Sequence, residues 1–331
     1  MSTDFSPATA YLLVCHGSRD PRPGQAAERL AQFVRDQLEA QLGAMPTLAK
    51  PAKGTSLYGT SQSPFERLPA MVYETHGQAA GVGRRHSSHP PLVGTACLET
   101  GALPLHQQIV NFGRRAVAAG MTEIRLVPIF LLRGVHVLSD LPAEVQLAQR
   151  LLPGLNLAVT AHLGDHPGLR HLVQDRLQTT TADTWLLLAH GSRRAEGNRS
   201  IQSLAQALGG TAAYWAVPPH LETQVIHLIQ QGVQRLAILP YFLFTGSATD
   251  AIIHRTEELA ERFPSLGIHL LPPLGPSPQL AQLVVDLALG RGPAKAPQPV
   301  VSLKRMARRS ALQPSSLVSN GLLQGIAHWG G

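Results

Sequence analysis

Two histidines stand just after apolar segments, where they are suited to metal binding or proton transfer. His16 follows the apolar run in YLLVCHGSR (11–19), and His136 ends LVPIFLLRGVH (126–136). Neutral imidazole binds first-row divalent metals and accepts a proton near pH 7. Two simpler interpretations stay open: His16 as the cap of a turn, and His136 as a packed side chain between two valines.

The chain contains both segments twice, in the same order. WLLLAHGSR (185–193) matches the segment around His16, and ILPYFLFTGSA (238–248) matches the segment that ends at His136. His190 is therefore the counterpart of His16, whereas Ala248 stands where the first copy has His136. The repetition predicts two similar domains, of which only the first keeps both histidines.

Other polar residues gather beside these motifs. Glu99 ends the segment TACLE, where a carboxylate could accept protons, help to bind a cation, or simply be a solvated charge. Guanidinium groups bind carboxylates or phosphates through two parallel hydrogen bonds. Five arginines flank the motifs and are candidates for such contacts: Arg19, Arg22, Arg133, Arg193 and Arg194.

The elements that must position these residues alternate between strands and helices. In the first copy we expect strands over 12–15, within 91–99, over 124–130 and over 155–161, and helices over 25–42, 105–119, 141–152 (with Asp140 near its N-cap) and 166–177. In the second copy we expect strands over 185–189, 212–217, 235–242 and 267–271, with a helix after each. Such strands, apolar throughout, indicate parallel sheets covered on both faces. Ligands bind beyond the C-terminal ends of such strands, where the histidine motifs lie.

The two copies differ in length, and this sets the expected domain limits. The first domain spans 1–178 and contains a flexible, Gly-, Ser- and Pro-rich insertion at about 44–91; the second spans 183–290, and 291–331 is a basic, Pro-rich, disordered tail. The insertion contains His76, His86 and His89. A histidine-rich tract can collect metal, but ordinary loop residues are the simpler interpretation.

The composition restricts the class of protein. No stretch reaches the ~20 consecutive apolar residues of a membrane span, and the N-terminus lacks the pattern of a signal peptide. Two cysteines, Cys15 and Cys97, make no disulfide framework, which favours the cytoplasm. The net charge of +7 favours an anionic partner. With 5% aromatic residues and no nucleic-acid-binding motif, a polycarboxylated small molecule fits better than nucleic acid.

Two motifs together resemble those of a known enzyme family. LLVCHGSRDPR (12–22) and VPIFLLRGVHVLSDLP (127–142) are similar to the histidine motifs of class II tetrapyrrole chelatases, and most closely to those of the sirohydrochlorin cobalto- and ferrochelatases. LLLAHGSRRAEGN (186–198) resembles the second half of the long, fused form. The resemblance covers about 11–43, 92–178 and 185–289. It implies two tandem Rossmann-like α/β domains, each a mainly parallel sheet flanked by helices, that face each other across a cleft.

The resemblance also implies roles for individual residues. His16 would be the proton acceptor and a metal ligand, His136 the second catalytic metal ligand, and Glu99 a contact to metal or substrate. The remaining substrate-binding residues would be Leu131, Leu132, Arg133, Gly134, Val135, Arg19, His190 and Arg193. The divalent metal, Co²⁺ or Fe²⁺, would be a substrate, and no permanently bound cofactor is expected.

The implied reaction inserts this metal into sirohydrochlorin, for siroheme or cobalamin biosynthesis. One chain supplies both halves, so we expect a monomer that binds neither nucleic acid nor membrane. Three alternatives stay open. The enzyme could use nickel or a related ring. The protein could be a non-catalytic tetrapyrrole or metal carrier, with the insertion as a loading loop. Its basic tail could bind nucleic acid.

Overall fold

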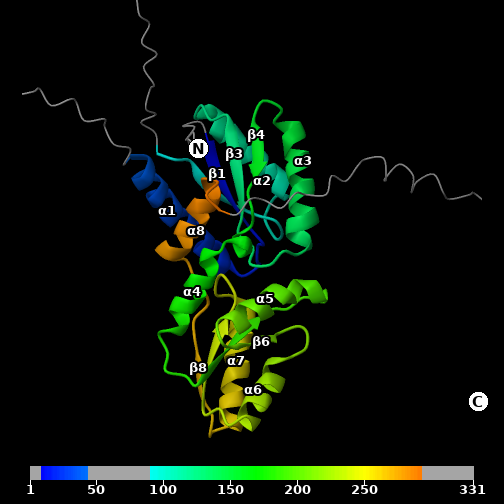
Figure 1. The fold of residues 1–331 in the computed structure, drawn as a ribbon. Coiled ribbons are helices and arrows are strands. Elements are labelled where there is room, and N and C mark those ends of the chain that lie inside the picture. Colours follow the sequence, from blue (N-terminus) through cyan, green and yellow to red (C-terminus); the bar gives the residue numbers. More distant parts are fainter. Residues whose placement is uncertain (1–8, 44–89, 293–331) are drawn as a thin grey trace, which may run out of the picture. The chain divides into compact units, whose positions relative to one another are not determined.

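The computed structural model describes residues 9–43 and 90–292, which form two α/β repeats (Figure 1). The first eight residues, nearly all of the expected insertion and the tail from 293 onward lie outside the described residues. Three histidines of the insertion, His76, His86 and His89, therefore lie outside them as well. The limits 1–178 and 183–290 stay predictions.

The first repeat alternates strands and helices around a parallel sheet. In chain order its elements are β1 (Thr9–Cys15), α1 (Pro21–Gly43), β2 (Val93–Cys97), α2 (Leu105–Ala118), β3 (Glu123–Pro128), α3 (Leu141–Leu151), β4 (Asn156–Val159) and α4 (Gly168–Leu177). The sheet order is β2-β1-β3-β4, and every pair is parallel. A π-helical turn (His136–Asp140) precedes α3, and a 3₁₀ turn (Leu163–Asp165) precedes α4.

The second repeat has the same order of elements and the same topology. Its elements are β5 (Thr184–Ala189), α5 (Ala195–Ala207), β6 (Thr211–Tyr214), α6 (Leu221–Gln230), β7 (Arg235–Pro240), α7 (Ser247–Arg262), β8 (Gly267–Leu270) and α8 (Pro278–Ala288). The sheet order is β6-β5-β7-β8, again with parallel pairs. The predicted fold class, two parallel α/β repeats flanked by helices, is confirmed.

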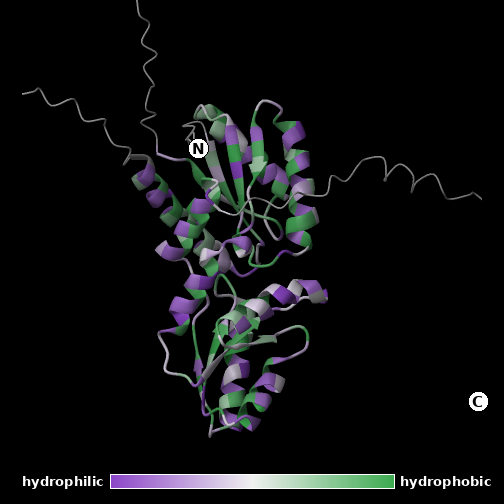
Figure 2. Cartoon of the chain, viewed as in Figure 1, coloured by the Kyte–Doolittle hydropathy of each residue, from purple (hydrophilic) through white to green (hydrophobic). Residues whose placement is uncertain are grey.

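The central strands β1 and β5 are almost entirely apolar because helices cover both faces of each sheet. Along β1, Tyr11 and Leu13 join one buried cluster, while Leu12 and Val14 join another on the opposite face. In Figure 2 the helices show hydrophobic and hydrophilic residues along their lengths, as expected when one face packs and the other meets water. Within the described ranges, the helices are too short or too polar to cross a membrane.

Four strands end two or three residues earlier than the sequence predicts. β3 stops at Pro128 rather than at residue 130, and β7 stops at Pro240 rather than at residue 242. β4 stops at Val159 rather than at residue 161, and β6 stops at Tyr214 rather than at residue 217. β4 and β6 each end at the last residue that pairs with the neighbouring strand, since the final pairs are Leu126 with Val159 and Ala189 with Tyr214. Apolar residues that follow these positions still pack into the core. The apolar runs in the sequence are therefore longer than the strands themselves.

The last helix of the second repeat packs on the first repeat. α8 contacts α1 and β3. In α1, Gln37 Nε2 donates to the carbonyl of Pro278 (2.8 Å), and in β3, Arg125 Nη1 donates to the carbonyl of Ala288 (2.9 Å). The first sheet is therefore covered in part by the most C-terminal described helix.

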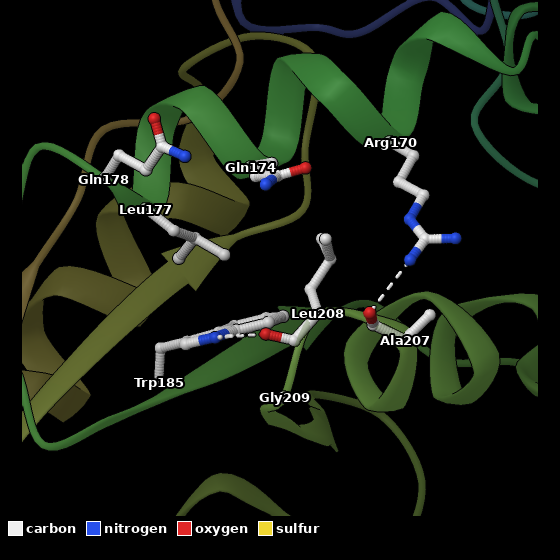
Figure 3. A pocket seen from close by; sticks show the side chains of 8 residues that line it. All are labelled: Arg170, Gln174, Leu177, Gln178, Trp185, Ala207, Leu208 and Gly209. Atoms are coloured by element: carbon white, nitrogen blue, oxygen red, sulfur yellow. Dashed lines mark hydrogen bonds between the residues drawn. The ribbon is translucent and has the colours of Figure 1, made fainter.

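The last helix of the first repeat, α4, makes hydrogen bonds to the second repeat. Arg170 Nη2 in α4 donates to the carbonyl of Ala207 at the end of α5 (2.9 Å; Figure 3). Arg176 Nη2, near the end of α4, donates to the carbonyl of Leu274 (2.7 Å). The repeats thus exchange their last helices, and one buried cluster contains strand residues of both sheets.

Because α8 packs on the first repeat, a destabilising substitution in α8 should lower the stability of that repeat. Leu280 is fully buried, so Leu280→Ala should lower the free energy of unfolding by about 2–5 kcal/mol. Native-state hydrogen exchange should then accelerate in α1 and β1 rather than in β5. Gln279→Ala, at an exposed position of the same helix, is the control. Faster hydrogen exchange confined to the second sheet would contradict the packing of α8 on the first repeat.

A buried histidine beside this helix predicts a pH dependence of stability. Burial lowers the pKa of His166 below its ordinary value of 6.5, although Asp286 of α8, 3.9 Å away, favours the protonated form. Below pH 6.5 the unfolded chain therefore binds a proton more readily than the folded one, and stability falls. The difference in unfolding free energy between wild type and His166→Gln should shrink as the pH falls from about 7 to about 5 in urea titrations. A constant difference would contradict this.

Candidate metal centre

Three side chains that could hold a metal ion converge at the C-terminal edge of the first sheet. His16 follows β1 directly, Glu99 lies two residues after β2, and His136 opens the π-helical turn between β3 and α3. β2, β1 and β3 are neighbours, so the segments that leave them meet at one place. One ligand atom from each of the three residues lies within 4.8 Å of the others.

The separations suit a single ion. Glu99 Oε2 is 4.0 Å from His16 Nδ1, and Glu99 Oε1 is 3.9 Å from His136 Nδ1. The two imidazole rings meet edge to face, with centroids 4.6 Å apart and an interplanar angle of 81°. Two ligands that are each ~2.1 Å from one ion lie at most ~4.2 Å apart, so the distance from Glu99 to each ring is one that a single ion can bridge. The side chains of His16 and Glu99 are about half exposed (53% and 51%), which leaves one side open.

A glycine brings two of these ligands together. Gly17 has φ = +99°, and a Cβ there would lie 1.9 Å from the carbonyl oxygen of Glu99. The neighbouring His16 carbonyl accepts a hydrogen bond from the Glu99 amide (2.8 Å). Only a residue without a side chain permits this approach, which explains the Gly that follows the histidine in this motif.

The residue after Glu99 is strained. Thr100 has φ = +55°, and it is the one non-glycine residue with positive φ among the residues that the structure describes. A β-branched residue is unfavourable in this conformation. The strain lies next to a candidate ligand, as is common at functional sites.

His136 is oriented by two further residues. Its Nδ1 lies 2.9 Å from Asp140 Oδ2, one helical turn along the chain, and its ring stacks on Phe130 (centroids 6.3 Å apart, 23°). Asp140 does occupy the N-cap position of α3, but it makes no capping bond, because the π-helical turn leads directly into that helix. A carboxylate that binds one ring nitrogen fixes the ring orientation, and it leaves Nε2 as the nitrogen that could hold a metal. The i,i+4 spacing of His136 and Asp140 is compatible with this pair, but Asp140 before Leu141 and Pro142 fits a helix cap equally well in the sequence.

The second repeat keeps the scaffold without the ligands. The His190 carbonyl accepts from the Ala216 amide (2.9 Å), just as the His16 carbonyl accepts from Glu99, so Ala216 is the counterpart of Glu99. Ala248, the predicted counterpart of His136, lies in the first turn of α7. Two of the three donors are therefore missing, and the first group is the one cluster of its kind in the described part of the chain.

The remaining candidate residues surround this centre or lie on the matching turn of the second repeat. Leu131 and Leu132 pack against the core, and the Gly134 amide closes a tight turn on the Leu132 carbonyl (3.0 Å). The others are exposed: Arg19, Arg133, Val135, His190, Arg193 and Arg194. Arg22 differs from them, because its guanidinium group is held by Asp20 and Asp250.

The two cysteines do not join the centre. Cys15 and Cys97 are neighbours in register on β1 and β2, and both are free thiols. Burial raises the pKa of Cys15 to about 12 and also raises that of Cys97. Both therefore stay protonated near neutral pH, which suits small, partly buried packing residues rather than metal ligands.

A surface pocket lies elsewhere, where α4 meets β5 and the end of α5 (Figure 3). Trp185 Nε1 donates to the carbonyl of Leu208 (3.2 Å) in its wall. No carboxylate, histidine or cysteine is among its lining residues: Arg170, Gln174, Leu177, Gln178, Trp185, Ala207, Leu208 and Gly209. It therefore offers no alternative set of metal ligands.

Comparison with known proteins identifies the family. The CbiX family model matches residues 72–180 and, a second time, residues 184–289. This chain belongs to the CbiX family. The first match does not include β1 and α1, which flank the His16 motif. The structure nevertheless places β1 in the first sheet of this CbiX chain, with α1 packed against β1 and β2, as β5 lies in the second sheet with α5 packed against it.

Curated relatives resemble part of the CbiX chain. A sirohydrochlorin cobaltochelatase of Priestia megaterium is 28% identical over 163 residues, which are 44% of this chain and 52% of that protein. A sirohydrochlorin ferrochelatase of the same organism is 27% identical over 158 residues, 44% of this chain and 59% of that protein. The matched region thus spans little more than half the length of either relative.

Solved structures share the fold over most of the chain. SirB from Bacillus subtilis with Fe³⁺ has a TM-score of 0.56 at 19% identity, covering 84% of this chain and 93% of that one. The sirohydrochlorin chelatase SirB from Bacillus subtilis subspecies spizizenii, in complex with cobalt, has a TM-score of 0.56 at 17% identity, with coverages of 85% and 93%. At these identities the likeness establishes the fold.

The close approach at Gly17 gives a test of the centre. Gly17→Ala should be more destabilising than Gly120→Ala and should abolish Co²⁺ binding, because the Glu99 backbone must move. Gly120 is the matched control: it has φ = +77° and no atom within 4 Å of the place that a Cβ would take, so it loses only about 1–2 kcal/mol for its backbone conformation. Urea unfolding and Co²⁺ absorbance titration measure the two effects. If Gly17→Ala and Gly120→Ala were equally destabilising and Co²⁺ binding were unchanged, the assignment of the metal centre beside Gly17 would be contradicted.

Proposed function

We propose that this chain is a sirohydrochlorin chelatase, which inserts Co²⁺ or Fe²⁺ into sirohydrochlorin and releases two protons, in the biosynthesis of siroheme or cobalamin. The observation that carries the proposal is the convergence of His16, Glu99 and His136 at one open edge of the sheet. Membership of the CbiX family and the names of the similar proteins support it.

The donor set suits a metal that must be passed on. Two imidazoles and one carboxylate bind a first-row divalent ion and leave coordination positions free for ring nitrogens. Because the side chains of His16 and Glu99 are about half exposed, a planar macrocycle can approach the ion from the open side. Asp140 keeps His136 in place while the ion leaves.

Insertion also needs a proton acceptor. Each ring nitrogen that binds the metal in place of its hydrogen releases a proton, and neutral imidazole accepts protons efficiently near pH 7. His16 meets this need at the tip of β1, with Glu99 close enough to stabilise the imidazolium that forms. His16 would thus hold the ion first and take one of the two protons as the ion moves into the ring, and the other proton would pass to solvent at the open side of the site.

The surroundings suit a polycarboxylated ring. Exposed Arg19, Arg133 and Arg193 can pair with substrate carboxylates, and their charge attracts an anionic substrate. Leu131, Leu132 and Val135 give the turn before His136 an apolar surface for the ring face. His190 would contact the substrate without holding the metal, since its repeat lacks the other donors.

Similarity does not choose between the two metals. The cobaltochelatase and the ferrochelatase of Priestia megaterium match this chain almost equally, at 28% and 27% identity. The ligands are also compatible with both ions, and with Ni²⁺. The metal therefore has to be determined by the rate of insertion.

Anaerobic absorbance spectroscopy with sirohydrochlorin and Co²⁺, Fe²⁺ or Ni²⁺ in turn tests the proposal. Wild type should convert many equivalents, and His16→Ala and His136→Ala should each lower kcat by about 100-fold or more, because each removes a ligand or a base. His254→Ala, at an exposed position in α7, is the control. Wild-type rates in both variants would contradict the assigned roles, and binding without turnover in wild type would favour a carrier.

A further inference from the structure

Arg22 is held between carboxylates of the two repeats. Its Nε donates to Asp20 Oδ1 (3.1 Å) and its Nη2 to Asp20 Oδ2 (2.6 Å). On the other side, Nη1 donates to Asp250 Oδ1 (3.1 Å) and Nη2 to Asp250 Oδ2 (2.5 Å). Both contacts are bidentate, the strong and directional form of an arginine–carboxylate pair.

The Asp20 side of this contact lies in the loop after His16. The Asp20 side chain is only 9% exposed, and its Oδ1 accepts from the Arg22 amide (3.0 Å), which caps the start of α1. The Asp20 amide donates to Ser18 Oγ (3.1 Å). Asp20 therefore ties together the segment between His16 and α1.

The Asp250 side is the start of α7, which corresponds to the turn that carries His136 in the first repeat. Ser247 Oγ donates to Asp20 Oδ2 (3.3 Å), and a Cβ at Gly246 would lie 3.1 Å from Pro23 Cγ. Thr249 fixes this turn, because its Oγ1 accepts from the Gly246 amide (2.8 Å) and donates to the Gly246 carbonyl (2.7 Å). The loop after His16 thus rests on a rigid turn.

The charges in this contact persist over a wide pH range. Arg22 holds the pKa of Asp20 well below its usual range and also lowers that of Asp250, and the two carboxylates raise the pKa of Arg22. An exposed ion pair usually stabilises little. This one differs in having a nearly buried carboxylate and two bidentate contacts.

We propose that Arg22 is a positioning residue for metal insertion, which fastens the loop that follows His16 to the first turn of α7. The second repeat, which lacks two of the three metal donors, thereby contributes Ser247 and Asp250 as supports for the histidine of the first repeat. The inference rests on the proposed function, because it concerns the geometry of the same centre.

Four variants and a control test this role. Arg22→Gln and Asp250→Asn break the contact from its two ends, and the double variant removes both charges together. Arg22→Lys keeps the charge but loses the bidentate geometry. Glu261→Gln makes the same change of charge as Asp250→Asn at an exposed position of the same helix, and is the control. Asp250→Asn does not alter α1, so its effect is separable from damage to that helix.

Two measurements on each full-length variant, with thermal unfolding to verify folding, decide the matter. Co²⁺ titration of the protein alone should show affinity reduced about tenfold in Arg22→Gln and Asp250→Asn, and kcat for insertion should fall by a similar factor. KM for sirohydrochlorin should change by less than about twofold, because the arginine does not touch substrate. The double variant should be no worse than either single one, and Arg22→Lys should recover only part of the loss.

Other results would overturn the proposal. Wild-type Co²⁺ affinity and kcat in Arg22→Gln or in Asp250→Asn would do so. An equal loss in Glu261→Gln, or a loss that the unfolded fraction explains, would also do so. If wild type binds Co²⁺ but inserts no metal, the proposed function fails, whereas the Co²⁺ affinities of the variants still decide whether Arg22 positions the centre.

Discussion

The candidate metal centre depends on one backbone contact, the approach of Gly17 to the carbonyl of Glu99. The contact joins the ends of β1 and β2, so His16 and Glu99 are held in a fixed relation by main-chain atoms rather than by their own side chains. Side chains placed in this way need no mutual hydrogen bond, and the 3.9–4.0 Å gaps between their ligand atoms stay open for an ion. The proposed ligands are thus brought together by the backbone of the two strands.

The second repeat shows that this scaffold and its chemistry are separable. Gly191 has φ = +85°, and a Cβ there would lie 2.7 Å from Val217 Cγ2, so the same turn is preserved after β5. Ala216 and Ala248 nevertheless stand where Glu99 and His136 stand in the first repeat. The second repeat retains the glycine turn that its packing requires, but not the Glu99 and His136 side chains. Its polar residues at the start of α7, Ser247 and Asp250, contact the first repeat.

Much of the fold was predictable from the sequence, because apolar strands ending at His-Gly, and their repetition, determine element order and a parallel sheet. The meeting of His16, Glu99 and His136 followed from the rule that parallel strands present their C-terminal ends at one edge. Three features were not predictable. An apolar helix face looks the same whichever sheet it covers, so the exchange of α4 and α8 left no signal. Asp140 before Leu-Pro looked like a helix cap. Arg22 contacts Asp250 across 228 positions of the chain, beyond the reach of local patterns.

The exchange of the last helices also bears on how the chain is made. The face of the first sheet that α1 covers is completed only when α8 has been synthesised. Leu38, a buried residue of α1, and Ala288, the last residue of α8, are 250 positions apart. At ~5–20 residues per second, the ribosome needs on the order of ten to fifty seconds to cover that distance. Throughout this time the N-terminal half exposes apolar surface that nothing yet covers. The packing of the first repeat is therefore completed only when the last described helix has left the ribosome, long after the strands of that repeat have been made.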